Sequence, residues 1–349
     1  MEQSEPKHKR RVRYSGTHPK TFQEKYKELQ PEKYEETLSK VIQKGNTPAG
    51  MHRPICVNEI MEILKIKPGD IGLDATLGYG GHTMVMLNHL ENKGHLYCID
   101  ADPIELPKTK ERLEKLGYGP EILAVQNLNF SQIDQVLNKE EKFDFVLADL
   151  GVSSMQIDNP ERGFSFKQDG PLDLRMNPTV GLTAAQRLRS MKEDEIVGML
   201  VENADEPHAD LIAREIVQEL RKGQKIETTK QLQKVIADAL KALPIRDKEE
   251  EIKKACQRSF QALRIDVNRE YDVLFEFLEK LPTVLSKGGR VAILSFHSGE
   301  DRLVKKSFQY FYRLGEYSSI APEFIRPSFE EQNSNSRSRS AKLRWAIRA

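Results

Sequence analysis

The sequence has few cysteines, and their spacing excludes the site types that depend on them. Its 349 residues contain three, Cys56, Cys98 and Cys256, which are widely separated and form no CxxC pair. A disulfide framework or a cysteine zinc site is therefore disfavoured, and buried reduced thiols are expected.

The sequence also has almost no net charge and no long apolar run. There are 54 Lys and Arg residues against 53 Asp and Glu, a formal net charge of +1. No global basic field therefore argues for nucleic acid, and any attraction to RNA must come from local clusters. No apolar run approaches the roughly 18 residues of a membrane span, and the N-terminus lacks the apolar core of a signal peptide. We expect a cytoplasmic protein without membrane contacts.

Basic residues dominate the first 20 positions, where six Lys and Arg residues stand against two Glu. Residues 1–50 are predicted to form a basic N-terminal extension that is partly disordered or helical. Within it, 22–44 has helical character and 45–50 is typical of a linker. A solvated tail and a phosphate-contacting arm both remain open.

From residue 52 short apolar strands alternate with helices, which indicates an α/β fold with a parallel sheet. The strands are predicted at 71–76, 94–100, 122–126, 143–151, 290–298 and 342–348. Helices are predicted at 57–66, 82–90, 103–116 and 273–285.

This alternation stops between about 155 and 265, where we predict no strand. Two possible capping boxes, Thr183 with Gln186 and Thr228 with Gln231, each precede a helical apolar pattern. An all-helical insertion into the sheet domain is therefore expected. The predicted boundaries are 156–265 for the insertion and 51–155 with 266–349 for the sheet domain.

The stretch LDATLGYGGHT, residues 73–83, indicates a ligand site at the end of the first strand. Glycines let the backbone approach a ligand closely, and the following helix offers free amides. Gly78 and Gly80 begin a dinucleotide fingerprint, but Thr83 stands where its third glycine would fall. Asp74 would repel a pyrophosphate and suits the ammonium group of S-adenosylmethionine. Asp100, at the end of the second strand, can accept hydrogen bonds from both hydroxyls of a ribose.

A dinucleotide-dependent oxidoreductase therefore remains a rival hypothesis, as does a purely structural glycine turn. Further motifs bear on this choice: DLGVSSMQID (149–158), GFSFKQDGPLDLRM (163–176), RSFQALRIDVN (258–268), LSFHSGEDRLVK (294–305) and SRSAKLR (338–344).

With these motifs, the chain from about residue 51 to its end resembles the MraW/RsmH family. Those enzymes methylate N(4) of a decoding-centre cytosine in 16S ribosomal RNA, cytosine-1402. The resemblance implies a class I SAM-dependent methyltransferase (Rossmann-like) sheet domain with an inserted all-helical domain that recognises the substrate. It also implies S-adenosyl-L-methionine as cofactor, and 16S rRNA or the small ribosomal subunit as partner rather than DNA.

The resemblance transfers cofactor contacts to matching positions of this chain, in addition to Asp74 and Gly78. These are Gly80, Gly81, His82, Asp100, Phe130, Asp149 and Gln156. The insertion departs from the family pattern at 203–216, NADEPHADLIAREI, where a Gly-Glu-Glu run is usual. A paralogue that acts on another base therefore stays open.

The expected chemistry needs neither a metal nor a covalent nucleophile. The amine of cytosine is a poor nucleophile because its lone pair is delocalised, so catalysis must depend on positioning and electrostatics. Asp149 is the candidate for orienting the amine, and its alternative is structural or cofactor-side hydrogen bonding. The surrounding ADLGVSS has no cysteine, which argues against methylation of carbon-5, and it lacks the Pro-Pro motif typical of DNA amino-methyltransferases.

A base within folded RNA must be turned out, and its flanking phosphates need cationic contacts. Candidates within or beside the motifs are Arg162, Arg175, Arg258, Arg264, His297, Arg302, Arg337, Arg339 and Lys342. For each of them a structural ion pair is the alternative. A hydrolase triad is disfavoured because Ser298 lacks a G-x-S-x-G elbow. A non-enzymatic ribosome-assembly factor also remains open, and the oligomeric state is not readable.

Overall fold

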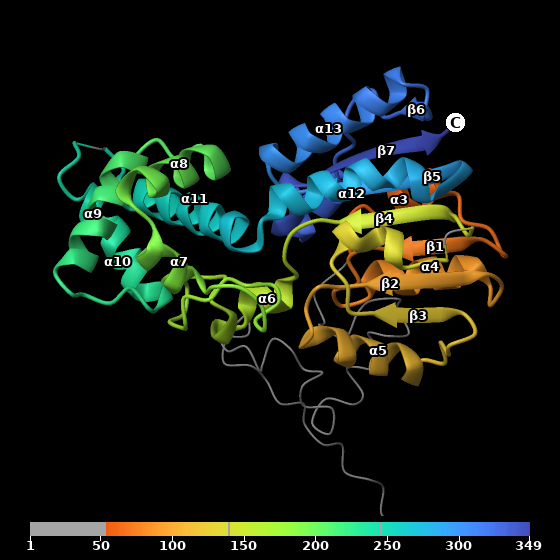
Figure 1. The fold of residues 1–349 in the computed structure, drawn as a ribbon, viewed down its shortest axis with the longest axis horizontal. Coiled ribbons are helices and arrows are strands. Elements are labelled where there is room, and N and C mark those ends of the chain that lie inside the picture. Colours follow the sequence, from red (N-terminus) through yellow and green to blue (C-terminus); the bar gives the residue numbers. More distant parts are fainter. Residues whose placement is uncertain (1–53, 139, 245) are drawn as a thin grey trace, which may run out of the picture. The chain divides into compact units, whose positions relative to one another are not determined.

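The computed structural model describes residues 54–349 except 139 and 245, so the predicted N-terminal extension lies outside the described residues. A seven-stranded sheet in the order β3-β2-β1-β4-β5-β7-β6 organises the described part of the chain (Figure 1). Its strands are β1 (Ile71–Asp74), β2 (His95–Ile99), β3 (Leu123–Gln126), β4 (Phe143–Asp149), β5 (Leu285–Ser295), β6 (Tyr317–Ile320) and β7 (Lys342–Arg348).

Strands β1 to β5 are parallel, whereas β7 is antiparallel to both of its neighbours. The predicted α/β class and class I methyltransferase sheet are therefore confirmed. The sheet positions the site because β1, β2 and β4 all end at the same edge, where ligands bind in parallel sheets. Strand β6 was missed, because its sequence, YSSI, has two serines at its centre and shows no apolar run.

The central strands pack closely because one glycine makes room for an aromatic ring. A Cβ on Gly72 of β1 would lie 1.9 Å from the ring of Phe145 on β4. Phe145 is fully buried, as are its neighbours Val146, Leu147 and Ala148. A continuous apolar run of this kind is typical of a strand covered on both faces.

Helices cover both faces of the sheet and bury two apolar clusters. Helices α3 (Val57–Leu64), α4 (Gly81–Leu90) and α5 (Glu105–Lys115) contribute to one cluster. Helices α12 (Glu270–Val284) and α13 (Ser298–Arg313), with the 3-10 helix η2 (Phe130–Gln135), contribute to the other. These layers hold the strand ends, and thus the site, in fixed positions.

Between β4 and β5 the described residues include five helices that share an apolar cluster of their own. They are α7 (Ala184–Ser190), α8 (Glu193–Ala204), α9 (Ala209–Arg221), α10 (Thr229–Leu240) and α11 (Lys248–Asn268). Both predicted capping boxes are present, at Thr183 and at Thr228. The remaining short helices are α6 (Ser154–Asp158), η3 (Pro160–Arg162), α14 (Phe329–Ser334) and η4 (Ser336–Ser340).

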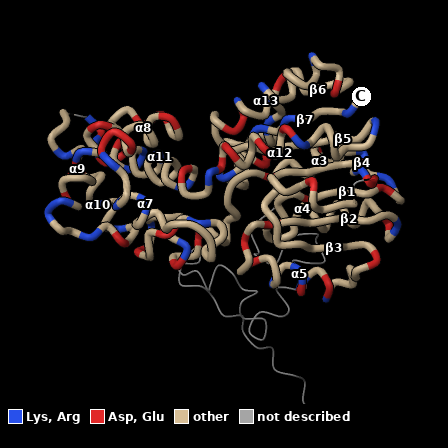
Figure 2. The backbone as a smooth tube through the Cα atoms, viewed as in Figure 1, with Lys and Arg blue, Asp and Glu red and all other residues tan. Residues whose placement is uncertain are grey.

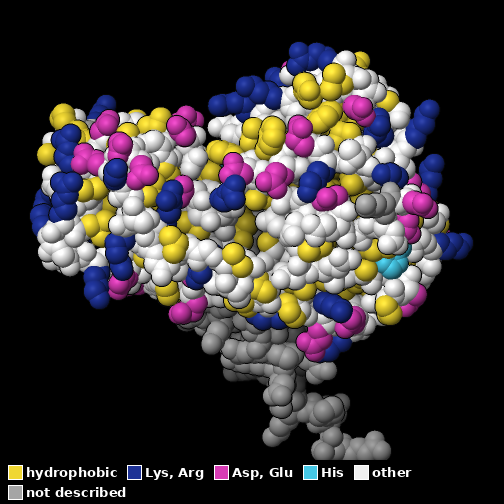
Figure 3. Space-filling model, viewed as in Figure 1, with side chains coloured by type: hydrophobic (Ala, Val, Ile, Leu, Met, Phe, Trp, Pro, Cys, Tyr) yellow, Lys and Arg dark blue, Asp and Glu magenta, His cyan; other side chains and the backbone are white. Residues whose placement is uncertain are grey.

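The described surface carries charges of both signs. Figure 2 shows the strands mostly free of charge, and Figure 3 shows positive and negative side chains interspersed over much of the visible face. The three cysteines are buried and free, as predicted. Among the described helices, none has the length and apolar character that crossing a membrane requires.

Candidate functional site

A carboxylate from the end of β2 fixes the conformation of the glycine loop between β1 and α4. Gly78 has a φ of 48° and Gly80 a φ of 76°, which glycine adopts without strain. The Gly78 amide donates a hydrogen bond to Asp100 Oδ2 over 2.7 Å. Gly80 caps α4, whose first residues are Gly81 and His82. The loop therefore presents bare backbone beside the end of β2.

Asp74 is held inside the protein at the end of β1. Its side chain accepts hydrogen bonds from Thr83 Oγ1 over 2.6 Å and from the Thr76 amide over 3.1 Å. It is only 2% exposed, and burial raises its pKa. These hydrogen bonds indicate that Asp74 fixes the start of α4 to the end of β1. They give less support to the predicted contact between Asp74 and a ligand.

Asp100 stands at the end of β2 and is partly accessible. Its two oxygens accept from the amides of Gly78 and Asp102, over 2.7 and 2.8 Å. Burial raises its pKa to about 6, against the lowering effect of these hydrogen bonds. A carboxylate oxygen has a second lone pair, so Asp100 can still accept from ribose hydroxyls.

We expect Asp100→Ala to weaken binding of S-adenosylhomocysteine by about tenfold or more, since hydrogen bonds to a charged group contribute about 1.5–3 kcal/mol. The anchor of the Gly78 amide is lost at the same time. Calorimetric titration measures the effect, and Asp134→Ala, which removes an exposed partner of Lys280, is the matched control. Unchanged affinity in the Asp100 variant would remove it from the cofactor site.

Phe130 and Gln156 differ in whether their side chains already make polar contacts within the protein. Phe130 begins η2, and its partly buried ring meets Phe277 edge to face at 5.2 Å. Gln156 is 8% exposed, and its Nε2 donates to Asp102 Oδ2 over 2.7 Å. Its Oε1 accepts from the Ser153 amide in a capping box. Phe130 is thus free to pack against a ligand, whereas the polar group of Gln156 is committed to the fold.

Asp149, at the end of β4, keeps both carboxylate oxygens free of hydrogen bonds within the described part of the chain. Oδ1 has no partner, and Oδ2 lies 3.6 Å from His82 Nδ1. The His82 ring is held by a 2.9 Å contact between Nε2 and the Ile55 carbonyl. The Asp149 side chain is 29% exposed. Of the three strand-end carboxylates, this one makes no hydrogen bond within the described residues, although its Oδ1 is itself buried.

The environment also makes Asp149 a stronger base than an ordinary aspartate. Burial raises its pKa to about 6; His82 lowers that pKa, and Asp74 and Glu300 raise it. We expect kcat/KM for methyl transfer to fall as the pH drops through about 6, because Asp149 and Asp100 then lose their charge and their full acceptor capacity. A profile from pH 5 to 8, with circular dichroism as the folding control, tests this; a flat profile would contradict it.

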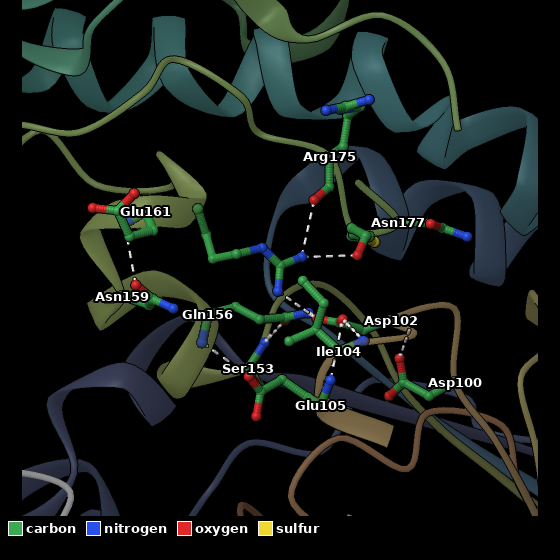
Figure 4. Close-up of polar contacts among 12 residues, drawn as sticks. Asp100, Asp102, Ile104, Glu105, Ser153, Gln156, Asn159, Glu161, Arg175 and Asn177 are labelled. Atoms are coloured by element: carbon green, nitrogen blue, oxygen red, sulfur yellow. Dashed lines mark hydrogen bonds and ion pairs between the residues drawn. The ribbon is translucent and has the colours of Figure 1, made fainter. Parts of the chain in front are cut away.

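A buried network of polar side chains, which the sequence did not indicate, supports these residues (Figure 4). Asp102, 1% exposed, accepts from the amides of Ile104 and Glu105 and from Gln156. Arg162 Nη1 lies 2.6 Å from Asp102 Oδ2, and Arg162 Nη2 donates to the carbonyls of Arg175 and Met176. The only available signal was the spacing DAD at 100–102, which places a second acid beside the ribose candidate.

Arg162 was predicted to contact RNA, but the structure gives it an internal role because its side chain is 7% exposed and paired. Other candidate cations are also paired. Arg175 pairs with Asp173, Arg258 with Glu206, Arg264 with Glu270, His297 with Glu300, Arg337 with Asp158, and Lys342 with Asp301. Arg302 and Arg339 are exposed, and Arg339 Nε donates to the Gln332 carbonyl. The charge of most of these predicted RNA-binding residues is thus neutralised by a nearby acidic side chain.

Glu270, His297 and Glu300 bring ligand-type atoms within 4.8 Å of one another. Arg264 donates to both carboxylate oxygens of Glu270, over 2.8 and 2.9 Å, so this group reads as ion pairs rather than as a metal site. The network joins α11 to α12 and to the start of α13.

Comparison with known proteins supports the predicted family. The model of the MraW methylase family matches residues 49–349 and begins after most of the predicted basic extension. The protein named ribosomal RNA small subunit methyltransferase H 2 in Alkaliphilus metalliredigens is 67% identical, over 100% of both chains. Ribosomal RNA small subunit methyltransferase H 1 of Lachnoclostridium phytofermentans is 64% identical, over 100% of this chain and 95% of its own length.

Proposed function

The chain belongs to the MraW methylase family, and from this premise we propose that it methylates N(4) of a decoding-centre cytosine, cytosine-1402 of 16S ribosomal RNA. The methyl donor is S-adenosyl-L-methionine. The names of the two relatives support ribosomal RNA of the small subunit as substrate. We also propose the identity of the target base, a cytoplasmic location and the small ribosomal subunit as the partner.

The cofactor fits the strand ends, because the bare glycine loop, the partly free lone pairs of Asp100 and the ring of Phe130 surround one edge of the sheet. Gly78, Gly80 and Gly81 let the cofactor approach the backbone, and Asp100 accepts from its ribose. When bound, the cofactor supplies an electrophilic methyl group.

The observation that carries the proposed reaction is the carboxylate of Asp149, which makes no hydrogen bond within the described residues. It accepts a hydrogen bond from one N–H of the cytosine amine, which directs the nitrogen lone pair away from the ring and toward the methyl group. In the transfer the nitrogen would gain a bond to the methyl carbon as the bond from that carbon to sulfur breaks, which leaves S-adenosylhomocysteine; the nitrogen would then carry positive charge and lose a proton. A carboxylate whose pKa is raised to about 6 is well suited to stabilise that charge and receive the proton.

The helical segments between β4 and β5 are proposed to hold the RNA around the target base. Their boundaries, 156–265, remain a prediction, since α11 runs on to Asn268 without interruption. Phe166 packs on Phe260 at 5.3 Å and belongs to this helical core, so it supports the scaffold.

The test uses small ribosomal subunits from a strain that lacks the gene. They are incubated with the protein and isotopically labelled S-adenosylmethionine, and the methylated nucleoside is mapped by mass spectrometry. We expect labelled N(4)-methylcytidine in the decoding-centre fragment. Label on another nucleotide would overturn the target, and no label despite cofactor binding would favour a non-enzymatic assembly factor.

A further inference from the structure

We infer that the outer face of α13 is a second RNA-binding surface, which holds the phosphate backbone of the substrate away from the target base. Arg302, Lys305, Lys306 and Arg313 form this surface, called here the α13 basic stripe. The inference rests on the proposed RNA substrate and adds where the rest of that RNA is held.

The α13 basic stripe runs along one face of the helix from Arg302 to Arg313. At 100° per residue, Arg302, Lys306 and Arg313 lie within about 40° of one direction, with Lys305 beside them. With a rise of 1.5 Å per residue, the stripe is about 16 Å long, enough to follow several consecutive phosphates. All four side chains are exposed.

Acidic residues do not neutralise the stripe. The two acids of α13, Glu300 and Asp301, are buried, 3% and 8% exposed, and pair with His297 and Arg344. Within the described ranges, none of the four stripe cations forms an ion pair with another residue. This distinguishes the stripe from the candidate cations inside the motifs, most of which are paired.

Other exposed helices mix their charges. On α5, the lysines Lys108, Lys110 and Lys115 pair with Glu105, Glu114 and Glu111. The neighbouring α12 exposes Glu276 and Glu279, which would repel phosphates. A phosphate backbone is thus attracted to α13 and repelled by α12. This difference in charge keeps the RNA on the exposed face of α13.

Aromatic side chains accompany the charge. Tyr310 and Tyr312 are 51% and 49% exposed on α13. Figure 3 shows Lys and Arg side chains together with hydrophobic ones at the place that α13 occupies in Figure 1. Cations interleaved with exposed tyrosines are typical of surfaces that bind single-stranded or looped RNA, where bases stack on rings.

The stripe also begins next to the network beside the site. Arg302 lies close enough to Tyr271 for its charge to lower the pKa of that phenol, against the larger raising effects of burial and of Glu300 and Glu270. The Tyr271 ring is 5.9 Å from that of His297, at the start of α13. Tyr271 further lines a cavity of about 460 Å³ with Asn203 and Arg269. RNA that leaves this region can therefore pass directly onto α13.

The test compares Lys305→Ala/Lys306→Ala/Arg313→Ala with Lys108→Ala/Lys110→Ala/Lys115→Ala, which removes equal charge from α5. Arg302 is kept because of its place beside the network. Affinity for unmethylated small subunits and for a decoding-centre RNA fragment is measured between 50 and 300 mM salt. We expect the α13 variant to lose at least about tenfold in affinity on both, and its slope of log K against log salt to fall by about 2–3. S-adenosylhomocysteine binding should stay unchanged in both variants.

Equal affinities and slopes in the two variants would overturn the inference, while wild-type methylation of the subunit would leave the proposed function standing. A loss on whole subunits without a loss on the RNA fragment would also overturn it, because it would indicate an acidic protein as the partner. If the wild-type protein methylates no small-subunit RNA, the proposed function fails first, and that result is independent of the variants.

Discussion

Asp149→Ala is expected to lower kcat for methyl transfer by about 10²–10³-fold, the range seen when a preorganised group that stabilises developing charge is removed. Neither oxygen of Asp149 makes a hydrogen bond within the described residues, and its contact with His82 is long, at 3.6 Å, so the substitution removes little from the fold. Affinity for S-adenosylhomocysteine should therefore change much less than kcat does. Single-turnover rates at saturating cofactor and RNA, together with calorimetry, separate the two quantities.

Two further variants make this result decisive. Asp149→Asn keeps one carbonyl oxygen that can accept from the amine but cannot take a proton, so its kcat should lie between wild type and Asp149→Ala. Asp272→Ala removes an exposed carboxylate that pairs with Arg269, and it should leave turnover unchanged. Normal turnover of Asp149→Ala would exclude a catalytic role. A loss confined to cofactor affinity would instead place Asp149 on the cofactor side.

The parts of the site that lie close in sequence could be predicted from it. The glycine loop follows a strand directly, and Asp100 ends the next strand, so their proximity follows from the geometry of parallel sheets. The bond between the Gly78 amide and Asp100 is a consequence of that arrangement. The state of each carboxylate could not be predicted, because burial and hydrogen bonding separate Asp74, which is committed to Thr83, from Asp149, which is not.

The pairing of the basic residues could not be predicted either. Arg162 and Asp102 are 60 positions apart, and Arg344 and Asp301 are 43 apart, so only the folded chain shows that they meet. Cations inside the recognised motifs were therefore assigned to RNA, although most of them neutralise nearby acids. The α13 basic stripe was only partly noticed, through Arg302, because Lys305, Lys306 and Arg313 form one face only once the helix is in place.

Arg162→Ala is expected to reduce the free energy of unfolding by about 3–5 kcal/mol, the usual cost of removing one partner of a buried ion pair. Both side chains are almost inaccessible, 7% for Arg162 and 1% for Asp102, so water cannot replace the guanidinium. The carbonyls of Arg175 and Met176 lose their donor as well. Urea unfolding measures the change. Arg269→Ala, which breaks an exposed pair with Asp272, should cost less than about 1 kcal/mol.

The reason for the loss can be tested separately from its size. In the Arg162 variant, Asp102 is a buried charge without its cation. Asp102→Asn in the same background removes that charge and should recover part of the lost stability. If it does not, lost packing rather than the orphaned charge explains the effect. Since the Asp102 amide also holds Asp100, the Arg162 variant should lose cofactor affinity too, which would link this buried pair to the ribose site.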